Sequence, residues 1–185
     1  MIQSTDNIDR QSPYRRAASR GLAFGLYLSA IFATWIFSAS FAGVSLLTCA
    51  LTLLVPLVLY ILMRRTDVFA GGLQLTTLWI CGIVTVAGGA VIAAAVTVGY
   101  LKWIDPEFIL RQLMNLIAMA DANPDPSYTE AANLARGMID NHAVPSATMW
   151  MSTMWLFTVS SGSILAGLLA VLIKLKSRSR RPISH

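Results

Sequence analysis

Charged side chains are scarce in this chain of 185 residues, and they are missing altogether from four long stretches of it. Lys, Arg, Asp and Glu make up 12% of the residues, where a soluble domain carries about 25%. The uncharged apolar stretches are residues 21–41, 44–63, 75–100 and 147–173. Each has the roughly 20 residues that an α-helix needs to cross about 30 Å of hydrocarbon. The sequence therefore predicts an all-α integral membrane protein with a bundle of four transmembrane helices.

The predicted spans also lack the ionisable side chains that mark ion paths, proton relays or catalytic groups inside membranes. The chain contains no nucleophile–base pair, glycine-rich nucleotide loop or metal-ligand spacing. Its two cysteines, Cys49 and Cys81, both fall within predicted spans. This location excludes a disulfide in an oxidising compartment, and two isolated thiols are too few for a structural zinc site. We predict that both cysteines are packing residues, with no catalytic, cofactor-binding or metal-binding residues and no cofactor.

The alternative is a catalytic or metal-binding site that includes His142. It follows Asp140 closely, and three further acidic residues precede it within about 20 positions: Asp121, Asp125 and Glu130. These side chains are of the types that form acid–base or metal sites. No second ligand stands at metal-binding spacing, so we interpret His142 as a solvated loop residue.

Basic residues are concentrated at one predicted membrane face. Eleven of the 14 lie before the first span, after the second or after the fourth, and only Lys102, Arg111 and Arg136 lie between the third and fourth. The positive-inside rule then places both termini and the connection between spans two and three in the cytoplasm. Residues 101–146, which carry six of the nine acidic residues, would lie outside. Because the basic residues sit at span ends and no nucleic-acid motif accompanies them, we expect no nucleic-acid partner.

The expected organisation is one membrane domain with a polar tail at each end. Residues 1–11 are predicted to be a disordered cytoplasmic tail, 12–175 a single membrane domain, and 176–185 a basic cytoplasmic tail. Ser12-Pro13 is typical of a helix start. A cleaved signal peptide, ending near Ser38-Ala39-Ser40, is the alternative for the first span. The apolar stretch is longer than the 7–15 residues usual in such a peptide, so we favour a retained span.

Residues 105–141 are predicted to form an amphipathic helical hairpin outside the membrane. Asp105-Pro106-Glu107 is typical of a helix start, and Asn123-Pro124-Asp125-Pro126 separates the two helices. The expected buried contacts are Leu113, Ile117, Leu134 and Met138. Three acidic residues are expected to face water: Asp121, Asp125 and Glu130.

Small residues recur at every fourth position in three of the spans, which predicts close helix packing within the membrane. The three ridges are Gly21, Gly25, Ser29 and Ala33; Gly89, Ala93 and Thr97; and Gly162, Ala166 and Ala170. They could pack within one bundle or form the seam of a homo-oligomer. Tight turns are predicted at Phe41-Ala42-Gly43 and at Gly71-Gly72.

The second span has a weakly polar face formed by Ser45, Thr48 and Thr52, followed by Pro56. Proline removes a backbone donor and favours a kink at this point. We interpret the face as a packing and kink surface, and the alternative is a lined substrate path.

The step from the third span into the hairpin reads Trp103-Ile104-Asp105-Pro106-Glu107-Phe108-Ile109, and the turn before that span carries Arg64-Arg65 and Gly71-Gly72. With the four spans, this pattern resembles the uncharacterised bacterial membrane family called domain of unknown function 4199, over roughly residues 18–175. The linker 123–126 and the alanine-rich second helix depart from the family pattern. The resemblance implies the four-span architecture and a multi-pass location in the bacterial inner membrane. It implies no activity and no catalytic residues.

These observations leave three functional hypotheses. We expect a non-enzymatic accessory or scaffold subunit, whose hairpin and bundle surface meet a membrane-protein partner. The alternative is a small transporter or lipid-handling protein that acts as a homo-oligomer, which the small-residue ridges and the hydroxyl face of the second span favour. A membrane enzyme is the third, without a visible catalytic constellation. Membrane lipids are expected partners in every case.

Overall fold

The computed structural model describes residues 12–38, 42–123 and 125–178. The helices in this part of the chain are α1 (Pro13–Ser38), α2 (Ala42–Phe69), α3 (Leu75–Gly99), α4 (Phe108–Ala122), α5 (Pro126–Asp140) and α6 (Ala147–Arg178), and a π-helical turn, η1 (Tyr100–Ile104), follows α3. None of the described residues forms a β-strand. The two predicted tails, residues 1–11 and the part of 176–185 beyond α6, lie outside the described residues.

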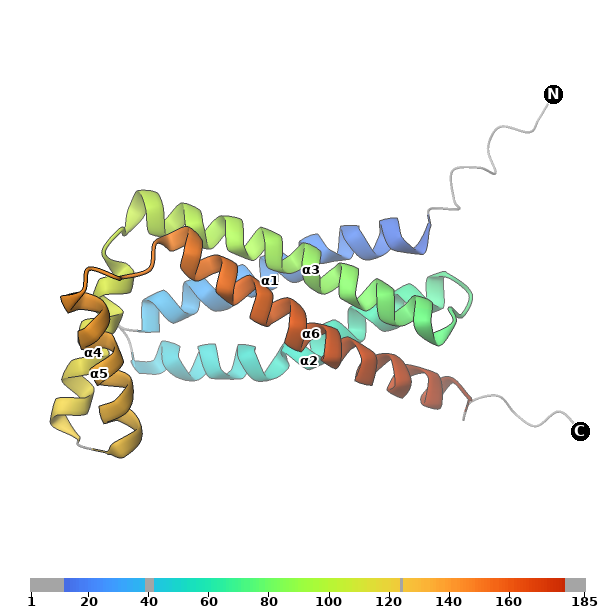
Figure 1. Cartoon of the computed structure of the whole chain (residues 1–185). Helices are drawn as coiled ribbons and strands as arrows, with labels where there is room; N and C mark the ends of the chain where they lie inside the picture. Colours follow the sequence, from blue (N-terminus) through green and yellow to red (C-terminus); the bar gives the residue numbers. More distant parts are fainter. Residues whose placement is uncertain (1–11, 39–41, 124, 179–185) are drawn as a thin grey trace, which may run out of the picture. The chain divides into compact units, whose positions relative to one another are not determined.

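The predicted fold class is confirmed. Four helical segments are long and apolar enough to cross a membrane: Pro13–Ser38, Gly43–Phe69, Leu75–Ile104 and Ala147–Ser177. The described residues pack as two compact units, one made of residues up to Ala93 with those from Trp155 onward, and one of Ala94–Met154. In the first unit, α1, α2 and the larger parts of α3 and α6 run side by side (Figure 1). In the second unit, α4 and α5 form an antiparallel hairpin (Figure 1).

The helix boundaries confirm one predicted end and correct another. The Ser12 hydroxyl accepts a hydrogen bond from the Arg15 N–H at 3.3 Å, so α1 begins at Pro13 as predicted. The predicted turn at residues 41–43 is wrong for Ala42 and Gly43, because both are already helical; Phe41 lies outside the described residues. α2 also runs past the predicted end of its span to Phe69.

The turn between α2 and α3 depends on the predicted glycine pair. Gly71 and Gly72 have φ values of 71° and 94°, a left-handed region that glycine adopts at no steric cost. Their N–H groups bond the carbonyls of Val68 at 3.2 Å and Asp67 at 2.9 Å, which is the Schellman arrangement for ending a helix. The Asp67 carboxylate also accepts the Leu73 N–H at 2.8 Å, so this side chain fixes the start of the return path.

Asp67 also links α2 to α6. Its carboxylate lies 2.7 Å from the Lys174 ammonium group, and the Asp67 side chain is only 9% exposed. An acid buried to this extent needs a charge partner, because removing one member of such a pair leaves an uncompensated buried charge. The ion pair therefore holds the end of α2 and the last turns of α6 together.

The start of α1 joins the same end of the first unit. The Arg20 guanidinium donates to the Leu62 carbonyl at 3.0 Å and to the Thr66 hydroxyl. It also lies 5.6 Å from the centre of the Phe69 ring, within range of a cation–π interaction. Arg16 donates to the Phe69 carbonyl at 3.3 Å. The cationic residues at the start of α1, the end of α2 and the end of α6 thus lie together, and we call this the basic end of the first unit.

α1 and α3 approach so closely that their glycines interlock. A Cβ atom added at Gly25 would lie 2.7 Å from the Ile92 Cβ and 2.8 Å from the Gly89 carbonyl oxygen. A Cβ at Gly89 would lie 3.1 Å from the Gly25 backbone nitrogen. Gly25 of the first predicted ridge and Gly89 of the second therefore contact each other within one bundle.

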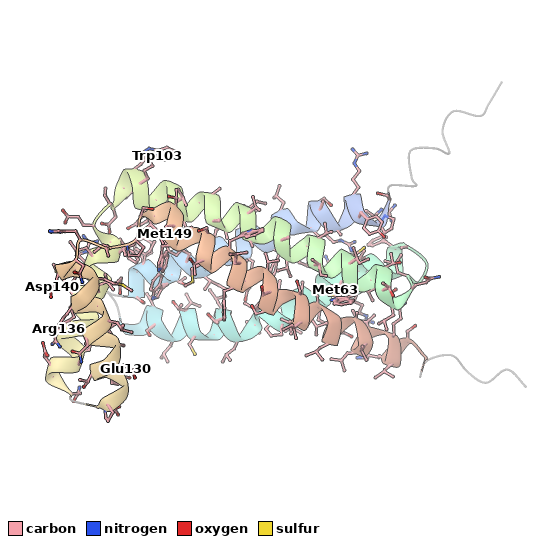
Figure 2. All side chains as sticks on the ribbon, in the orientation of Figure 1. Met63, Trp103, Glu130, Arg136, Asp140 and Met149 are labelled. Carbon is pink, nitrogen blue, oxygen red and sulfur yellow. The ribbon has the colours of Figure 1, made fainter. Side chains whose placement is uncertain are left out.

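The α6 ridge packs within the same unit. A Cβ atom at Gly162 would lie 2.5 Å from a methyl group of Val86, and Ala166 and Ala170 are fully buried. Around them lies a core of larger side chains that includes Met63 (labelled in Figure 2). The other members of this core are Phe24, Leu59, Leu78, Val86, Leu169 and Ile173.

Three hydrogen bonds between helices accompany this packing. The Tyr27 hydroxyl donates to the Leu51 carbonyl at 2.5 Å, the Thr85 hydroxyl to the Ala17 carbonyl at 3.2 Å, and the Trp79 indole to the Ser163 carbonyl at 2.9 Å. Such bonds contribute about 0.6 kcal/mol each on average in membrane proteins. They tie α1 to α2, α1 to α3 and α3 to α6.

Substitution of Gly25 by leucine should destabilise the bundle. The new side chain would collide with the backbone of α3 at Gly89, which cannot move aside as a flexible side chain can. We expect a loss of about 1–3 kcal/mol, the usual cost of overpacking. Thermal unfolding in mild detergent would measure it. Gly43→Leu is the matched control, because a Cβ there meets nothing within 4 Å. Equal melting temperatures for the two variants would contradict the close contact between α1 and α3.

Candidate functional site

His142 has a structural role at the end of α5. Its backbone has φ of 51°, and its N–H bonds the Ile139 carbonyl at 3.1 Å while the Ala143 N–H bonds the Met138 carbonyl at 2.8 Å. This is again the Schellman arrangement, with histidine in the position that glycine usually takes. Within residues 12–38, 42–123 and 125–178, no group of three or more His, Cys, Asp or Glu side chains is placed to hold a metal ion.

The cavity between the four helices of the first unit is small and mostly apolar. It has a volume of about 140 Å³, below the roughly 300–1,000 Å³ of ordinary ligand pockets. Its lining comes from α1, α2, α3 and α6: Phe24, Leu28, Val55, Leu59, Val86, Thr158, Ser161, Gly162 and Leu165. Thr48 and Thr52 are not among the lining residues, and each hydroxyl bonds a carbonyl of its own helix. The predicted polar face of the second span therefore lines no path through this bundle.

The two cysteines differ in their surroundings. Cys81 is buried in the first unit, as its predicted packing role requires. Cys49 is exposed on α2, so its assignment as a packing residue is wrong. An apolar residue in a span can face either lipid or a neighbouring helix. The sequence pattern does not distinguish these two environments, so it did not show which cysteine is buried.

The hairpin of the second unit begins later than predicted. α4 starts at Phe108, and residues 105–107 form a turn after η1. The Asp105 carboxylate does not cap a helix N-terminus, and it accepts a hydrogen bond from the Arg111 guanidinium one turn into α4. The Phe108 ring packs edge-on against Tyr100, with 6.4 Å between the ring centres. An ion pair and an aromatic contact thus fix the entry into the hairpin.

Alanines form the buried seam of the hairpin. Ala120 of α4 is 6% exposed, and Ala132 and Ala135 of α5 are 0% and 2% exposed. The predicted burial of Leu134 and Met138 is wrong, because these side chains are 63% and 40% exposed. Apolar residues occupy most positions of α5 between 131 and 139, so periodicity alone did not select the buried stripe. Small side chains permit the closest approach of two helices, and the larger ones are left outside.

One ion pair crosses the hairpin at its surface. The Arg136 guanidinium lies 2.5 Å from the Asp121 carboxylate and also donates to the Asn133 side chain at 3.0 Å. Both members of the pair are substantially exposed, so it contributes at most about 1 kcal/mol. The predicted exposure of Asp121, Asp125 and Glu130 is confirmed.

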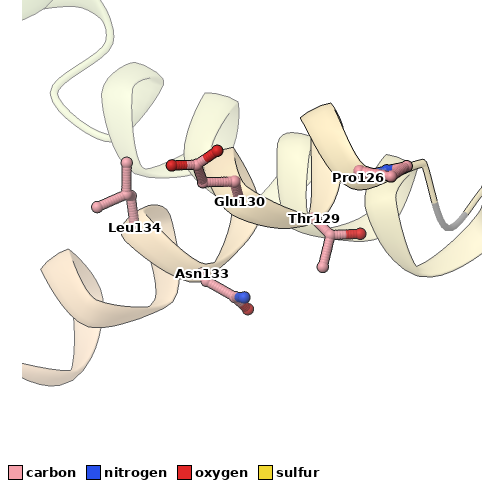
Figure 3. Close-up of a pocket in the computed structure, with 5 residues that line it drawn as sticks. All are labelled: Pro126, Thr129, Glu130, Asn133 and Leu134. Atoms are coloured by element: carbon pink, nitrogen blue, oxygen red, sulfur yellow. The ribbon is translucent and has the colours of Figure 1, made fainter.

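An open depression runs along the outer face of α5. Figure 3 shows its five lining residues, all from the first turns of this helix: Pro126, Thr129, Glu130, Asn133 and Leu134. The Glu130 carboxylate and the Leu134 side chain point to the same side of α5 (Figure 3). The Glu130 carboxylate forms no hydrogen bond or ion pair with any other described residue. We call this set of five residues the α5 face; it combines a free carboxylate with an exposed apolar side chain.

Most of the chain matches the model of one protein family. Residues 20–174 match the family described as proteins of unknown function, DUF4199. The chain belongs to this family. The match confirms the resemblance seen in the sequence and carries no activity with it. No curated protein and no solved structure matches the chain.

The seam of the hairpin can be tested by two substitutions on neighbouring positions of α5. Ala135→Leu should separate the two helices, because the seam has no room for three further carbons, at a cost of about 1–3 kcal/mol. Leu134→Asp should leave the fold unchanged, since this side chain is exposed. Hydrogen exchange over residues 108–140 would report the difference. If Leu134→Asp raised exchange as much as Ala135→Leu, the alanine seam would be refuted.

Proposed function

We propose that this protein is a non-enzymatic accessory or scaffold subunit of a bacterial inner membrane, whose hairpin binds a second membrane protein. The α5 face carries the proposal. On this face, an apolar side chain and an unpaired carboxylate lie together on the surface of α5. The stripe of α5 that packs against α4 is a different one, formed by Ala132 and Ala135. Tyr128 and Met138 of the same helix are exposed as well, at 51% and 40%. An exposed apolar patch that is rimmed by polar side chains is typical of an interaction surface.

The partner proposed for the α5 face is a segment that is both basic and apolar. Leu134 offers an apolar contact, and Glu130 offers a carboxylate without a cation of its own. The hairpin region as a whole is acidic, since residues 101–146 carry six acidic and three basic residues. Two of those basic residues are already paired, Arg111 with Asp105 and Arg136 with Asp121. Charge complementarity therefore favours a cationic partner.

The proposal places the hairpin outside the cytoplasm and both termini inside. The basic end of the first unit brings together cations from three separate segments of the chain, as the positive-inside rule requires of a cytoplasmic face. The alternative function, a small oligomeric transporter or lipid-handling protein, has less support. The bundle cavity is too small for an ordinary ligand, and the glycine ridges are used within one chain.

The topology can be tested by cysteine labelling in intact cells. Cys49→Ala and Cys81→Ala would first remove the native thiols. In that background, a cysteine at Ala122 should react with a membrane-impermeant thiol reagent, and one at Ser177 should react only after the membrane is opened. Both positions are exposed, so access depends on the side of the membrane. Labelling of both from one side, or the reverse pattern, would refute the orientation.

The accessory function can be tested by photocrosslinking in the native membrane. A photoreactive amino acid at Asn133, within the α5 face, should form a crosslink to one distinct membrane protein. The same amino acid at Asn115, an exposed position on α4, is the control. Leu134→Asp and Glu130→Lys should each remove the Asn133 crosslink, whereas Glu107→Lys should retain it. Crosslinks only to a second copy of the chain would favour the homo-oligomer instead, and crosslinks only to lipid would also overturn the proposal.

A further inference from the structure

A groove at the basic end of the first unit combines free cations, hydroxyl groups and apolar walls. It lies between α2 and α6 and has a volume of about 170 Å³, several times the roughly 10–15 Å³ that one water molecule needs on this measure. Its lining is Tyr60, Arg64, Asp67, Val68, Ile173, Lys176 and Ser177. The groove is therefore large enough for a phosphate group and its immediate contacts.

The charges around this groove are not balanced. Asp67 is the acid in the lining, and its carboxylate is already occupied by the Lys174 ammonium at 2.7 Å and the Leu73 N–H at 2.8 Å. Arg64 and Lys176 form no ion pair or side-chain hydrogen bond with any other described residue. The Asp67–Lys174 pair therefore neutralises itself and leaves two cations, one from each helix, facing the same groove.

The donor groups match the chemistry of phosphate. A guanidinium group can bind two phosphate oxygens at once, and an ammonium group acts as a mobile point charge. Tyr60 and Ser177, which also line the groove, each carry a hydroxyl that can donate a hydrogen bond. No described acidic side chain other than Asp67 lines the groove, so an anion would meet little repulsion.

The apolar surroundings favour a lipid as the source of that phosphate. Val68 and Ile173 line the groove itself, and Ile61 and Leu172 are exposed on α2 and α6 in the adjoining turns toward the middle of the spans. A second groove on the other side of Arg64 is lined by Tyr60, Ile61, Arg65 and Val68. A phosphate held by Arg64 could thus leave its acyl chains against apolar helix surface. Basic pockets between helices at a membrane surface are known to bind anionic headgroups.

We propose that the groove between α2 and α6 binds the phosphate of an anionic phospholipid, with Arg64 and Lys176 as its two cationic ligands. The site is independent of the α5 face and does not depend on the proposed accessory function. A bound lipid there would bridge α2 and α6 next to the Asp67–Lys174 pair.

The test uses the full-length protein in nanodiscs of phosphatidylcholine, with phosphatidylglycerol titrated in and binding followed by native mass spectrometry. The wild type should retain phosphatidylglycerol in preference to phosphatidylcholine. Arg64→Gln and Lys176→Gln should each weaken its binding about five-fold, and the double variant roughly thirty-fold. Arg15→Gln is the matched control, since it removes an exposed cation from the same end but from outside the groove.

Three results would overturn the proposal. Equal losses in Arg15→Gln and in the double variant would mean a diffuse surface attraction. Displacement of the lipid by soluble glycerol phosphate at similar concentration would mean that the site takes free phosphate. Unchanged binding in both single variants would mean that the lipid binds elsewhere. Melting temperatures in pure phosphatidylcholine would check folding, and if the double variant is unstable the two single variants decide the question.

Discussion

The close approach of α1 and α3 at Gly25 and Gly89 is the contact on which the first unit depends. In lipid, the tails are as apolar as leucine side chains, so helices gain little by burying apolar surface against each other. They associate through dense packing and interhelical hydrogen bonds instead. The glycines bring the two backbones together, and Thr85 can then reach the Ala17 carbonyl from α3. A side chain at Gly25 would remove both kinds of contact at once.

The charged side chains that the structure describes in the first unit are gathered at its basic end, and two of them, Asp67 and Arg20, hold the helices together there. Asp67 binds Lys174 and the turn after α2, and Arg20 binds carbonyl and hydroxyl groups of α2. Because the Asp67 and Arg20 charges are satisfied, the two cations that line the groove, Arg64 and Lys176, are available for a ligand. The same end of the unit therefore serves both the fold and the proposed lipid site.

The second unit is held together by different contacts from those of the first. Its two helices meet through alanines, and an ion pair between Asp121 and Arg136 joins them at the surface. This arrangement uses the small side chains for the fold and leaves Leu134 and Glu130 outside. The proposed functions of the two units are therefore recognition of a protein and of a lipid, and the side chains proposed to contact each ligand, Leu134 and Glu130 in one unit and Arg64 and Lys176 in the other, are exposed.

The sequence by itself determined the four spans, the start of α1 at Pro13, the glycine turn at 71–72 and the hairpin between the third and fourth spans. Each of these follows from local composition, because span length and turn conformation need no distant contact. Tertiary structure decided which stripe of α5 is buried, since alanine, leucine and methionine positions were equally compatible with the apolar pattern. It also decided the role of Asp67. This residue is the one acid between Arg10 and Asp105, which was a signal in the sequence, but its partner Lys174 lies 107 positions away and only folding brings the two together.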